Sequence, residues 1–443
     1  MLTRDQADAK AAIEKWLNST ETRPFLLEGG AGVGKTYLLG EVLKMARRTT
    51  VCATPTHKAA NVLRRKLDAF GVPWVRGYDP TWWDGVSVIT GTTASLLGIA
   101  PIISEEQDEK VKFGKSGAGL LKKMIPSLLV IDEVSMLSLA SLVDLCKVAK
   151  ATGMKILIVG DAAQLPPVKQ KAIPFGRIQH RATLREIVRQ AEGSAIIEVA
   201  WAVRDGRPWS DIEGTGLSRV AKPAAAFLEA LEAPGERLEE EREVFISYRN
   251  ARVNAVCEAA CKKLYGHGRL AFAPGELVLS ESNLYRDHEL IVANQDELTV
   301  ESFDEAARDP VLGVPVRLRR RGGGLVVTHY LSPEDRANDA HPYNRELEAR
   351  KAEALKYQES FRKAHGPGRS LVDRHRKEAW REFFKWRDAT LISFRHPFAI
   401  TSHKSQGSTY RAVFADVPDL ARFSPHGLYV AVTRPRDLLV VPA

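Results

Sequence analysis

Residues 25–36 read Phe25-Leu26-Leu27-Glu28-Gly29-Gly30-Ala31-Gly32-Val33-Gly34-Lys35-Thr36, a short apolar run that leads into a glycine-rich turn. Such glycines let backbone N–H groups turn inward around a polyphosphate, and a helix that follows them offers the positive end of its dipole. Lys35 is placed to reach the β- and γ-phosphates, and Thr36 to ligate Mg²⁺. The pattern predicts a nucleotide-binding loop between a strand and a helix, which makes NTP hydrolysis the first hypothesis.

The composition is that of a globular protein with more than one core and a basic surface. The chain has 443 residues, of which 44% are hydrophobic and 27% charged, and it is long for a single domain. Its net charge of +9 favours a polyanionic partner, although many basic proteins have none. No apolar run approaches the roughly 20 residues that cross a bilayer, and the first residues do not resemble a secretory signal. We therefore expect a cytoplasmic protein.

The four cysteines, Cys52, Cys146, Cys257 and Cys261, are scattered and lack the paired spacing of metal ligands. Cys257 and Cys261 could share one face of a helix, but packing in a core is the more common role of such thiols. We expect no disulfide and no zinc.

Short continuous apolar runs alternate with helical patterns in the first part of the chain. The runs are residues 25–27, 51–53, 128–131 and 156–159, and the clearest helical patterns cover 37–47 and 137–150. Runs of this kind suit parallel strands that are buried on both faces. The order predicts an α/β fold with a doubly wound parallel sheet, in which ligands bind beyond the carboxyl ends of the strands.

Three later apolar runs, at 244–247, 412–415 and 438–441, could build a second α/β unit. Between the first of these and the others, residues 275–279 and 297–300 alternate enough to be strands of a small barrel. A highly charged segment then extends from Ser332 to about Arg387. Its stretch Glu346-Leu347-Glu348-Ala349-Arg350-Lys351 indicates a solvated helix, so a charged surface insertion is expected there.

Acidic and polar residues follow the predicted strands at the edge where the glycine loop lies. Asp132, at the end of the run 128–131, could hold Mg²⁺ through water, and Glu133 could orient or deprotonate the attacking water. Gln164, in the segment 160–168, could contact both the γ-phosphate and that water, with a plain turn as the alternative. Phosphoryl transfer needs such positioning, together with a metal and positive charge near the γ-phosphate.

Seven segments, taken in order, resemble the motif series of superfamily 1 helicases. They are Gln6, the loop 29–36, Ala53-Thr54-Pro55-Thr56-His57-Lys58-Ala59-Ala60, Asp132-Glu133-Val134-Ser135-Met136, Gly160-Asp161-Ala162-Ala163-Gln164-Leu165-Pro166-Pro167, Thr401-Ser402-His403-Lys404-Ser405-Gln406-Gly407 and Tyr429-Val430-Ala431-Val432-Thr433-Arg434. The residues of the fourth and sixth segments resemble those of superfamily 1B, the RecD/Dda branch. The compact length also resembles that branch, and the Dda type is the nearest in size and layout. The resemblance spans nearly the whole chain.

The resemblance implies two RecA-like P-loop NTPase domains with ATP and Mg²⁺ bound between them. Residues 1–188 would form the first domain, with a small β-hairpin insertion, the pin, at 99–124. Residues 189–275 and 393–443 would form the second domain. Residues 276–392 would form an insertion that consists of an SH3-like barrel and the charged helical segment.

The resemblance also implies roles for single residues in the ATP site. Gln6 matches a glutamine that reads the adenine edge, and Gly407 matches a residue beside the nucleotide. Arg189 and Arg434 match two arginines that reach the γ-phosphate from the second domain, where a guanidinium fork suits the spread charge. The expected catalytic set is Lys35, Thr36, Asp132, Glu133, Gln164, Arg189 and Arg434.

Contacts to a nucleic acid strand are expected from loops at the same sheet edges, namely Thr54, Pro55, Thr56 and His57, then Thr92, Thr93 and Ser95, and finally His403, Lys404 and Gln406. Such groups position phosphates and sugars without reading sequence, although each could instead be a helix cap or a turn residue. Residues 102–114 have the pattern of a hairpin, in which Phe113 could be a base-stacking wedge, and an ordinary surface hairpin is the alternative.

Three functions stay open. The leading hypothesis is a monomeric ATP-dependent DNA helicase of a bacterial or phage-infected cytosol, which moves 5′ to 3′ on single-stranded DNA and acts at forks, possible partners being single-strand-binding or replisome proteins. The direction is implied by the resemblance alone. The second hypothesis is a DNA-stimulated translocase that strips proteins without unwinding, and the third is a small-molecule P-loop phosphotransferase. Two departures from the family pattern, Gln295 after Asn294 instead of glycine and Arg249 instead of threonine, lie outside the catalytic set.

Overall fold

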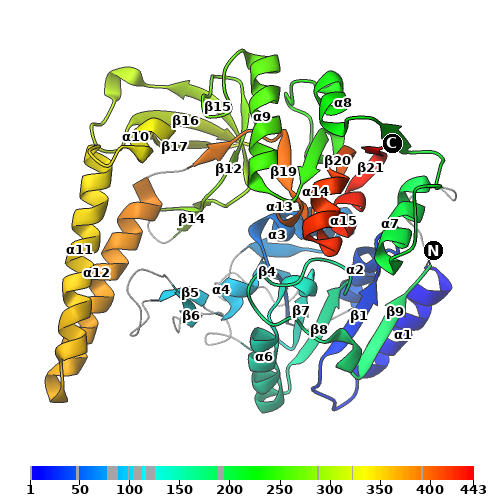
Figure 1. The fold of residues 1–443 in the computed structure, drawn as a ribbon. Helices are drawn as coiled ribbons and strands as arrows, with labels where there is room; N and C mark the ends of the chain where they lie inside the picture. The colour runs from blue at the N-terminus through cyan, green and yellow to red at the C-terminus, as the bar shows by residue number, and fades with distance from the viewer. Residues whose placement is uncertain are drawn as a thin grey trace.

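In the described part of the chain, two parallel sheets, one five-stranded antiparallel sheet and two two-stranded hairpins are present (Figure 1). The structure is a computed structural model, and it describes residues 2–45, 49–76, 88–97, 99–102, 112–115, 125–186, 194–286, 289–321, 323–390 and 393–443. In Figure 1 the first sheet lies in the lower half and the second above it, while the antiparallel sheet lies beside the second and carries a long helical arm.

The first sheet has seven parallel strands in the order β3-β4-β2-β7-β8-β1-β9. The strands are β1 Phe25–Gly29, β2 Thr50–Thr54, β3 Trp74–Arg76, β4 Val88–Thr92, β7 Leu128–Ile131, β8 Lys155–Gly160 and β9 His180–Leu184. The inner strands are buried on both faces, which explains why they consist of continuous apolar runs. The four predicted runs are all strands of this sheet.

Helices cover both faces of the first sheet. One face packs against α1 Arg4–Leu17, α2 Lys35–Met45 and α3 His57–Ala69, and the other against α4 Thr93–Leu97 and α6 Leu139–Thr152. The two apolar clusters are separate, since alternate residues of each strand point to opposite faces. This arrangement confirms the predicted doubly wound sheet.

The second sheet has five parallel strands in the order β10-β21-β20-β11-β19. They are β10 Leu217–Val220, β11 Glu243–Ser247, β19 Ala399–Thr401, β20 Tyr410–Ala415 and β21 Pro435–Pro442. On one face lie α7 Ala195–Asp205, α14 Val417–Phe423 and α15 Pro425–Val432, and on the other α8 Pro223–Ala230 and α9 Asn250–Tyr265. The second α/β unit that was predicted from 244–247, 412–415 and 438–441 is therefore present.

The chain leaves the second sheet after α9 and returns to it at β19. In between it forms an antiparallel sheet in the order β17-β16-β15-β12-β18, with β12 Leu277–Ser280, β15 Glu297–Phe303, β16 Val314–Arg320, β17 Leu325–Tyr330 and β18 Phe394–Arg395. A hairpin of β13 Leu284–Arg286 and β14 Glu289–Val292 lies in the same segment. An SH3-like classification of this sheet stays a prediction.

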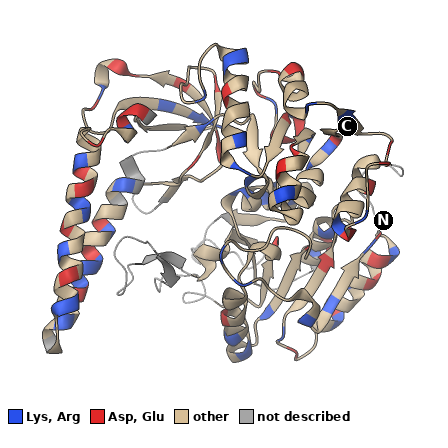
Figure 2. Cartoon of the chain, in the orientation of Figure 1, with Lys and Arg blue, Asp and Glu red and all other residues tan. Residues whose placement is uncertain are grey.

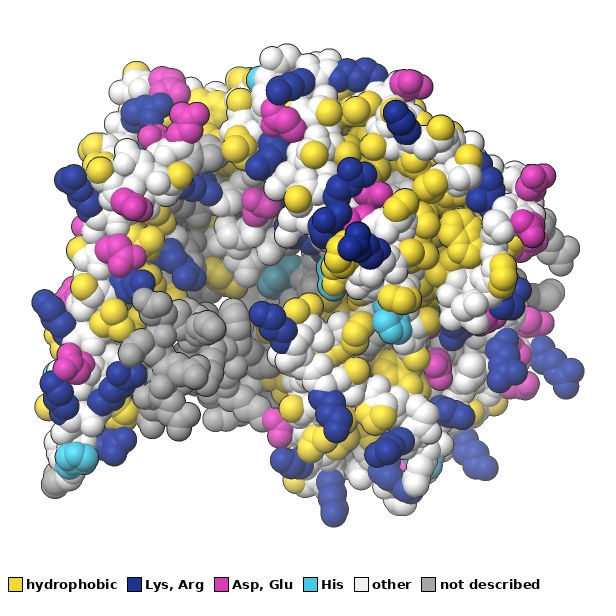
Figure 3. All heavy atoms as spheres, viewed as in Figure 1, with side chains coloured by type: hydrophobic (Ala, Val, Ile, Leu, Met, Phe, Trp, Pro, Cys, Tyr) yellow, Lys and Arg dark blue, Asp and Glu magenta, His cyan; other side chains and the backbone are white. Residues whose placement is uncertain are grey.

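The charged segment forms a helical arm. After the short α10 Pro333–Ala337, helix α11 Pro342–Lys363 runs outward and α12 Arg369–Thr390 runs back along it. Acidic and basic side chains are interspersed along the arm (Figures 2 and 3), as in a solvated helix. In Figure 1 a small antiparallel hairpin of β5 Ile99–Ile102 and β6 Lys112–Lys115 lies between the arm and the first sheet. Residues 103–111, where the tip of the predicted pin falls, lie outside the described residues.

No helix in the described part of the chain is both long and apolar enough to span a membrane.

Candidate nucleotide site and nucleic-acid interface

The glycine-rich loop joins β1 to the first turn of α2, as the sequence predicts. Gly32 and Gly34 have positive φ values of 79° and 76°, which favour glycine. Lys35 folds back over the loop, and its Nζ donates to the carbonyl oxygens of Gly29 and Gly30, both at 2.8 Å. Burial lowers the pKa of Lys35, while the nearby carboxylates of Asp161, Glu133 and Asp132 oppose that shift. The loop therefore has the geometry of a phosphate cradle with acidic groups at its side.

The acidic pair follows β7 directly. Glu133 has a left-handed backbone, with φ 54° and ψ 42°, and its N–H donates to Asp132 Oδ1 at 2.9 Å. A positive φ is uncommon for a residue with a side chain, and such strain concentrates at functional sites. Burial and the charge of Asp132 raise the pKa of Glu133, whereas Arg434, Lys35 and Lys66 act to lower it. Glu133 thus lies among the cations that would face a triphosphate.

Arg434 brings a cation from the second sheet to the acids of the first. Its guanidinium donates to Val430 O at 3.0 Å, Ser408 O at 3.1 Å and Thr433 Oγ1 at 2.8 Å. Burial lowers the pKa of Arg434, and the charge of Glu133 opposes this shift most strongly. Arg434 is therefore held by hydrogen bonds to residues of the second α/β unit while it lies near Glu133 of the first.

Direct hydrogen bonds join the two parallel sheets at this place. Gln406 Nε2 donates to Ser135 Oγ at 3.1 Å and to Gln164 Oε1 at 3.0 Å, and the two glutamines are buried. Tyr429 donates its hydroxyl proton to Asp161 Oδ2 at 2.6 Å and accepts from the Ala31 N–H at 3.1 Å. One backbone donor of the phosphate loop is therefore bound by a side chain of the second domain.

Three residues around the loop were not assigned from the sequence. Asp161 and Tyr429 stand within the quoted motifs but received no role, and Arg204 was not singled out. Arg204 Nη2 lies 3.5 Å from Asp161 Oδ1, and a Cβ added to Gly30 would come within 2.7 Å of Arg204 Nη1. Arg204 on α7 therefore covers the loop closely. Its only sequence signal is a basic residue at the end of a helix, which is common.

Gln6 lies next to the loop, in a capping box at the start of α1. The Thr3 N–H donates to Gln6 Oε1 at 3.1 Å, and Gln6 Nε2 donates to Val33 O at 3.1 Å. Gln6 thus connects the first helix to the phosphate loop. Thr36 Oγ1 accepts from Lys66 Nζ at 3.2 Å, and Gly407 has φ 82° beside Ala59. Arg189 lies outside the described residues.

Several of the expected strand contacts have local hydrogen bonds. Thr54 donates to Thr56 O at 2.9 Å, Thr56 caps α3 at the Ala59 N–H, and Thr92 Oγ1 lies 2.9 Å from Ser95 Oγ. These bonds match the alternative role as caps and turns. Pro55 and His57 belong to the same turn into α3, and Thr93 starts α4.

The contacts expected from the second domain lie on α13 Ser402–Ser405 and just after it. Lys404 Nζ lies 3.5 Å from Glu281 Oε1, and the His403 ring lies 5.5 Å from that of Tyr248. Burial lowers the pKa of His403. Gln406 points into the interface of the two sheets rather than toward solvent. Phe113 pairs with Pro101 in the small hairpin, but its side chain is not among those described.

Comparison with known families agrees with this geometry. Residues 1–217 match the family described as "AAA domain", and residues 396–441 match the "UvrD-like helicase C-terminal domain". The two matched domains support the resemblance to superfamily 1B helicases of the Pif1/RecD type. A specific likeness to the Dda type stays a prediction.

Two curated relatives and two solved structures are among the proteins to which this chain is similar. The chain is 31% identical over 198 residues to an uncharacterized protein of Acanthamoeba polyphaga mimivirus, and 31% identical over 148 residues to the ATP-dependent DNA helicase Pif1 of Campylobacter jejuni. These alignments cover 42% and 32% of this chain but only 38% and 28% of the relatives.

The solved structures match over the full length. One describes DNA unwinding at forked double-stranded DNA by two coordinating Pif1 helicases, with a TM-score of 0.55 and 19% identity. The other is a Pif1 helicase from Bacteroides in complex with ADP-AlF3 and single-stranded DNA, with a TM-score of 0.53 and 19% identity. Each covers 100% of this chain and 92% of the other. At this identity the likeness shows the fold.

Proposed function

We propose that this protein is an ATP-dependent DNA helicase that hydrolyses ATP between its two RecA-like sheets and moves 5′ to 3′ on single-stranded DNA. One observation carries the proposal: Glu133 of the first α/β unit lies close to both Lys35 of the loop and Arg434, which directly precedes β21 of the second sheet, so a triphosphate on the loop would contact both domains. The polarity rests on the resemblance to superfamily 1B. The proposed domains are residues 1–188, with a pin at 99–124, then 189–275 with 393–443, and the insertion 276–392.

The described residues suit ATP and Mg²⁺. The Thr36 hydroxyl and the Asp132 carboxylate would hold Mg²⁺, mostly through water, and the ion would neutralise charge on the β- and γ-phosphates. Lys35 would exchange its two carbonyl partners for phosphate oxygens. Tyr429 would release the Ala31 N–H to the nucleotide, since that amide is one of the loop donors.

Hydrolysis then depends on the acids and on the far arginine. Glu133 would orient the attacking water and accept its proton, and its raised pKa makes the carboxylate a stronger base. Arg434 would stabilise the charge that develops on the γ-phosphoryl oxygens, a contribution worth about 10³–10⁵ in rate for arginines in this role. Loss of the γ-phosphate would weaken the attraction between the two domains.

DNA would lie across both domains at the same sheet edges. Residues 54–57, 92–95 and 403–404 would contact phosphates and sugars of the DNA strand. Such contacts position the DNA without reading its sequence. The bond from Gln406 to Gln164 would connect the strand-binding segment of the second domain to the γ-phosphate side of the first. The hairpin that contains Phe113 would act as the pin that separates the duplex.

The test compares the wild type with Lys35→Ala and with Lys44→Ala, which removes an exposed lysine of the same helix. ATP hydrolysis is measured with and without single-stranded DNA, and unwinding on forks that carry a 5′ or a 3′ tail, in DNA and RNA versions. We expect DNA-stimulated hydrolysis and unwinding from the 5′ tail, both lost in Lys35→Ala and kept in Lys44→Ala. Normal hydrolysis by Lys35→Ala would refute the site.

The other functions give different results in the same assays. A translocase would show DNA-stimulated hydrolysis without unwinding, and a small-molecule phosphotransferase would show no stimulation by oligonucleotide. Deletion of residues 102–113 tests the pin, because loss of unwinding with intact DNA-stimulated hydrolysis is expected. Unchanged unwinding after this deletion would remove the hairpin from the mechanism.

A further inference from the structure

Two cysteines and a histidine meet inside the molecule, away from the nucleotide site. Cys257 and Cys261 lie one turn apart on α9, and His396 lies between β18 and β19. The three residues are 6%, 0% and 0% exposed. Their ligand atoms all lie within 4.8 Å of one another, which is true of no other group of three His, Cys, Asp or Glu residues in the described part of the chain.

The histidine is held as in a metal site. His396 Nε2 lies 3.0 Å from Glu276 Oε2, while the buried Nδ1 has no hydrogen-bond partner. Histidines that bind metals with one ring nitrogen commonly donate the other N–H to a carboxylate, which fixes the tautomer. The ring is also stacked on Phe398 at 5.7 Å and on Phe272 at 4.8 Å between centroids. The free nitrogen is therefore fixed in direction.

We propose that Cys257, Cys261 and His396 bind a Zn²⁺ ion, with Glu276 as the carboxylate that orients His396. Zinc binds thiolate sulfur at about 2.3 Å and imidazole nitrogen at about 2.0–2.1 Å, which places tetrahedral ligands roughly 3.5–4 Å apart. Rotation of the two cysteine side chains would bring the three atoms to that spacing. Each thiol loses a proton to solvent on binding, and two thiolates neutralise the ion.

Three protein ligands leave a fourth position for water. His267 does not fill it, because its Nε2 lies 2.6 Å from Glu276 Oε1 and its Nδ1 lies 3.0 Å from Gly268 O. The site departs from our expectation of no zinc. That expectation came from spacing along the chain, and the third ligand is far from the cysteine pair in sequence.

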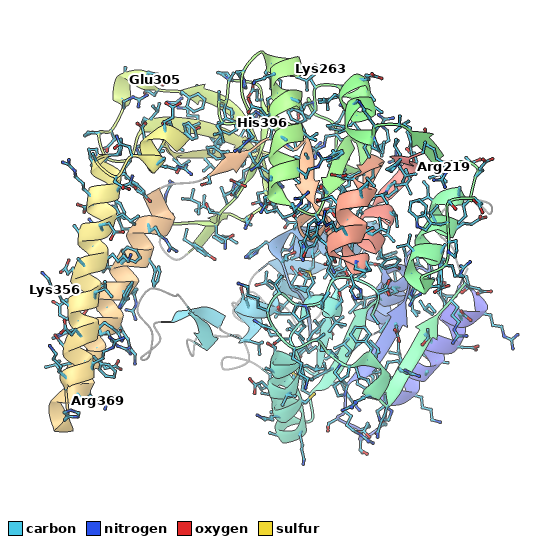
Figure 4. All side chains as sticks on the ribbon, in the orientation of Figure 1. Arg219, Lys263, Glu305, Lys356, Arg369 and His396 are labelled. Atoms are coloured by element: carbon cyan, nitrogen blue, oxygen red, sulfur yellow. The ribbon has the colours of Figure 1, made fainter. Side chains whose placement is uncertain are left out.

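The position of the site suggests what the ion does. Glu276 directly precedes β12, where the chain enters the antiparallel insertion, and His396 follows β18, where it leaves. The cysteines belong to α9, which covers the second parallel sheet. Figure 4 labels His396 at this junction, beside α9. Zinc would therefore connect α9 to the two points where the chain enters and leaves the insertion, and it would fix the insertion relative to the second domain.

The test uses the full-length protein, purified and then dialysed in buffer with Mg²⁺ and without zinc. We expect about one zinc per chain by elemental analysis. Replacement by Co²⁺ should give the thiolate charge-transfer band and the intense visible bands of tetrahedral cobalt. Both should be lost in the double variant Cys257→Ser/Cys261→Ser and kept in Cys146→Ser, which removes a thiol from the first domain. Glu276→Gln should weaken zinc binding by about 10–100-fold.

Two outcomes would overturn the proposal. One is a wild type that takes up no zinc and shows no cobalt–thiolate band on titration with Co²⁺, a result that does not depend on how any variant folds. The other is a double variant, shown by circular dichroism to be folded, that keeps the cobalt band. Neither measurement requires ATPase or helicase activity, so the zinc site and the proposed function can fail independently.

Discussion

The bond between Gln406 and Gln164 is expected to couple DNA binding to ATP hydrolysis. Gln406→Ala removes both bonds of Gln406 Nε2, to Ser135 Oγ at 3.1 Å and to Gln164 Oε1 at 3.0 Å. A neutral hydrogen bond contributes about 0.5–1.5 kcal/mol, so the pair contributes roughly 2 kcal/mol. At about 1.4 kcal/mol per factor of ten, DNA-stimulated kcat/KM should fall by about 30-fold.

The assay is ATP hydrolysis as a function of single-stranded DNA concentration, for Gln406→Ala, Gln164→Ala and the double variant. Because the two glutamines contact each other, the effects should be non-additive by about 0.5–3 kcal/mol. Gln358→Ala is the matched control, since it removes another buried glutamine, in the arm and far from the cleft along the chain. Additive losses from the two cleft variants, or full stimulation in Gln406→Ala, would refute the coupling.

Three further variants test the electrostatics of the fold. Glu133→Gln should lower ATP turnover by about 10²–10⁴. It should also raise the melting temperature at pH values above the ordinary pKa of a glutamate, because burial and Asp132 raise the pKa of Glu133 and the wild type loses stability as that carboxyl ionises. A variant that melts below the wild type at alkaline pH would contradict this. Asp419→Asn should cost about 1.5–3 kcal/mol at pH 7 by urea unfolding. Burial acts to raise the pKa of Asp419, but hydrogen bonds from Arg249 and Ser247 lower it. The stability lost in Asp419→Asn should therefore shrink as the pH falls through the lowered pKa of the wild-type carboxyl. A loss of stability that does not depend on pH would argue against this role of the carboxylate. Lys58→Ala removes the ammonium that lies 2.5 Å from Glu239, whose side chain is 12% exposed and keeps its contact with Tyr410. The variant should cost at most about 3–5 kcal/mol, partly recovered by adding Glu239→Ala. No recovery in the double variant would count against the ion pair.

The strands and the phosphate loop were predictable because their signals are local. A run such as 128–131 is apolar throughout, since its strand is buried on both faces, and the loop needs glycine at defined positions. The strand order of the first sheet was not predictable, because pairing joins segments that are distant in sequence. The same holds for the bonds of Tyr429 and Gln406, whose partners lie more than two hundred residues away.

One departure from the family pattern has a local explanation. Gln295 has φ 71°, a conformation that favours the glycine often found there. Its side chain compensates, because Gln295 Oε1 accepts from Arg395 Nη2 at 2.6 Å and Nε2 donates to Ser280 O at 3.3 Å. The glutamine thus links the turn to β18 and β12. The backbone conformation alone would have predicted glycine at position 295. The hydrogen bonds with Arg395 and Ser280 explain why a glutamine can stand there.

The helical arm has a mechanical consequence. Helices α11 and α12 have 22 residues each, which corresponds to a rod of roughly 33 Å. Its root is continuous with the antiparallel sheet, and its far end lies near Arg369, labelled in Figure 4. A rotation of about 10° at the root would therefore displace the end by roughly 6 Å, close to one helical turn. A small rotation where the chain enters and leaves the insertion would therefore become a large movement at the tip of the arm, even if neither sheet changed. The stiffness of this connection to the second domain sets how far the arm swings.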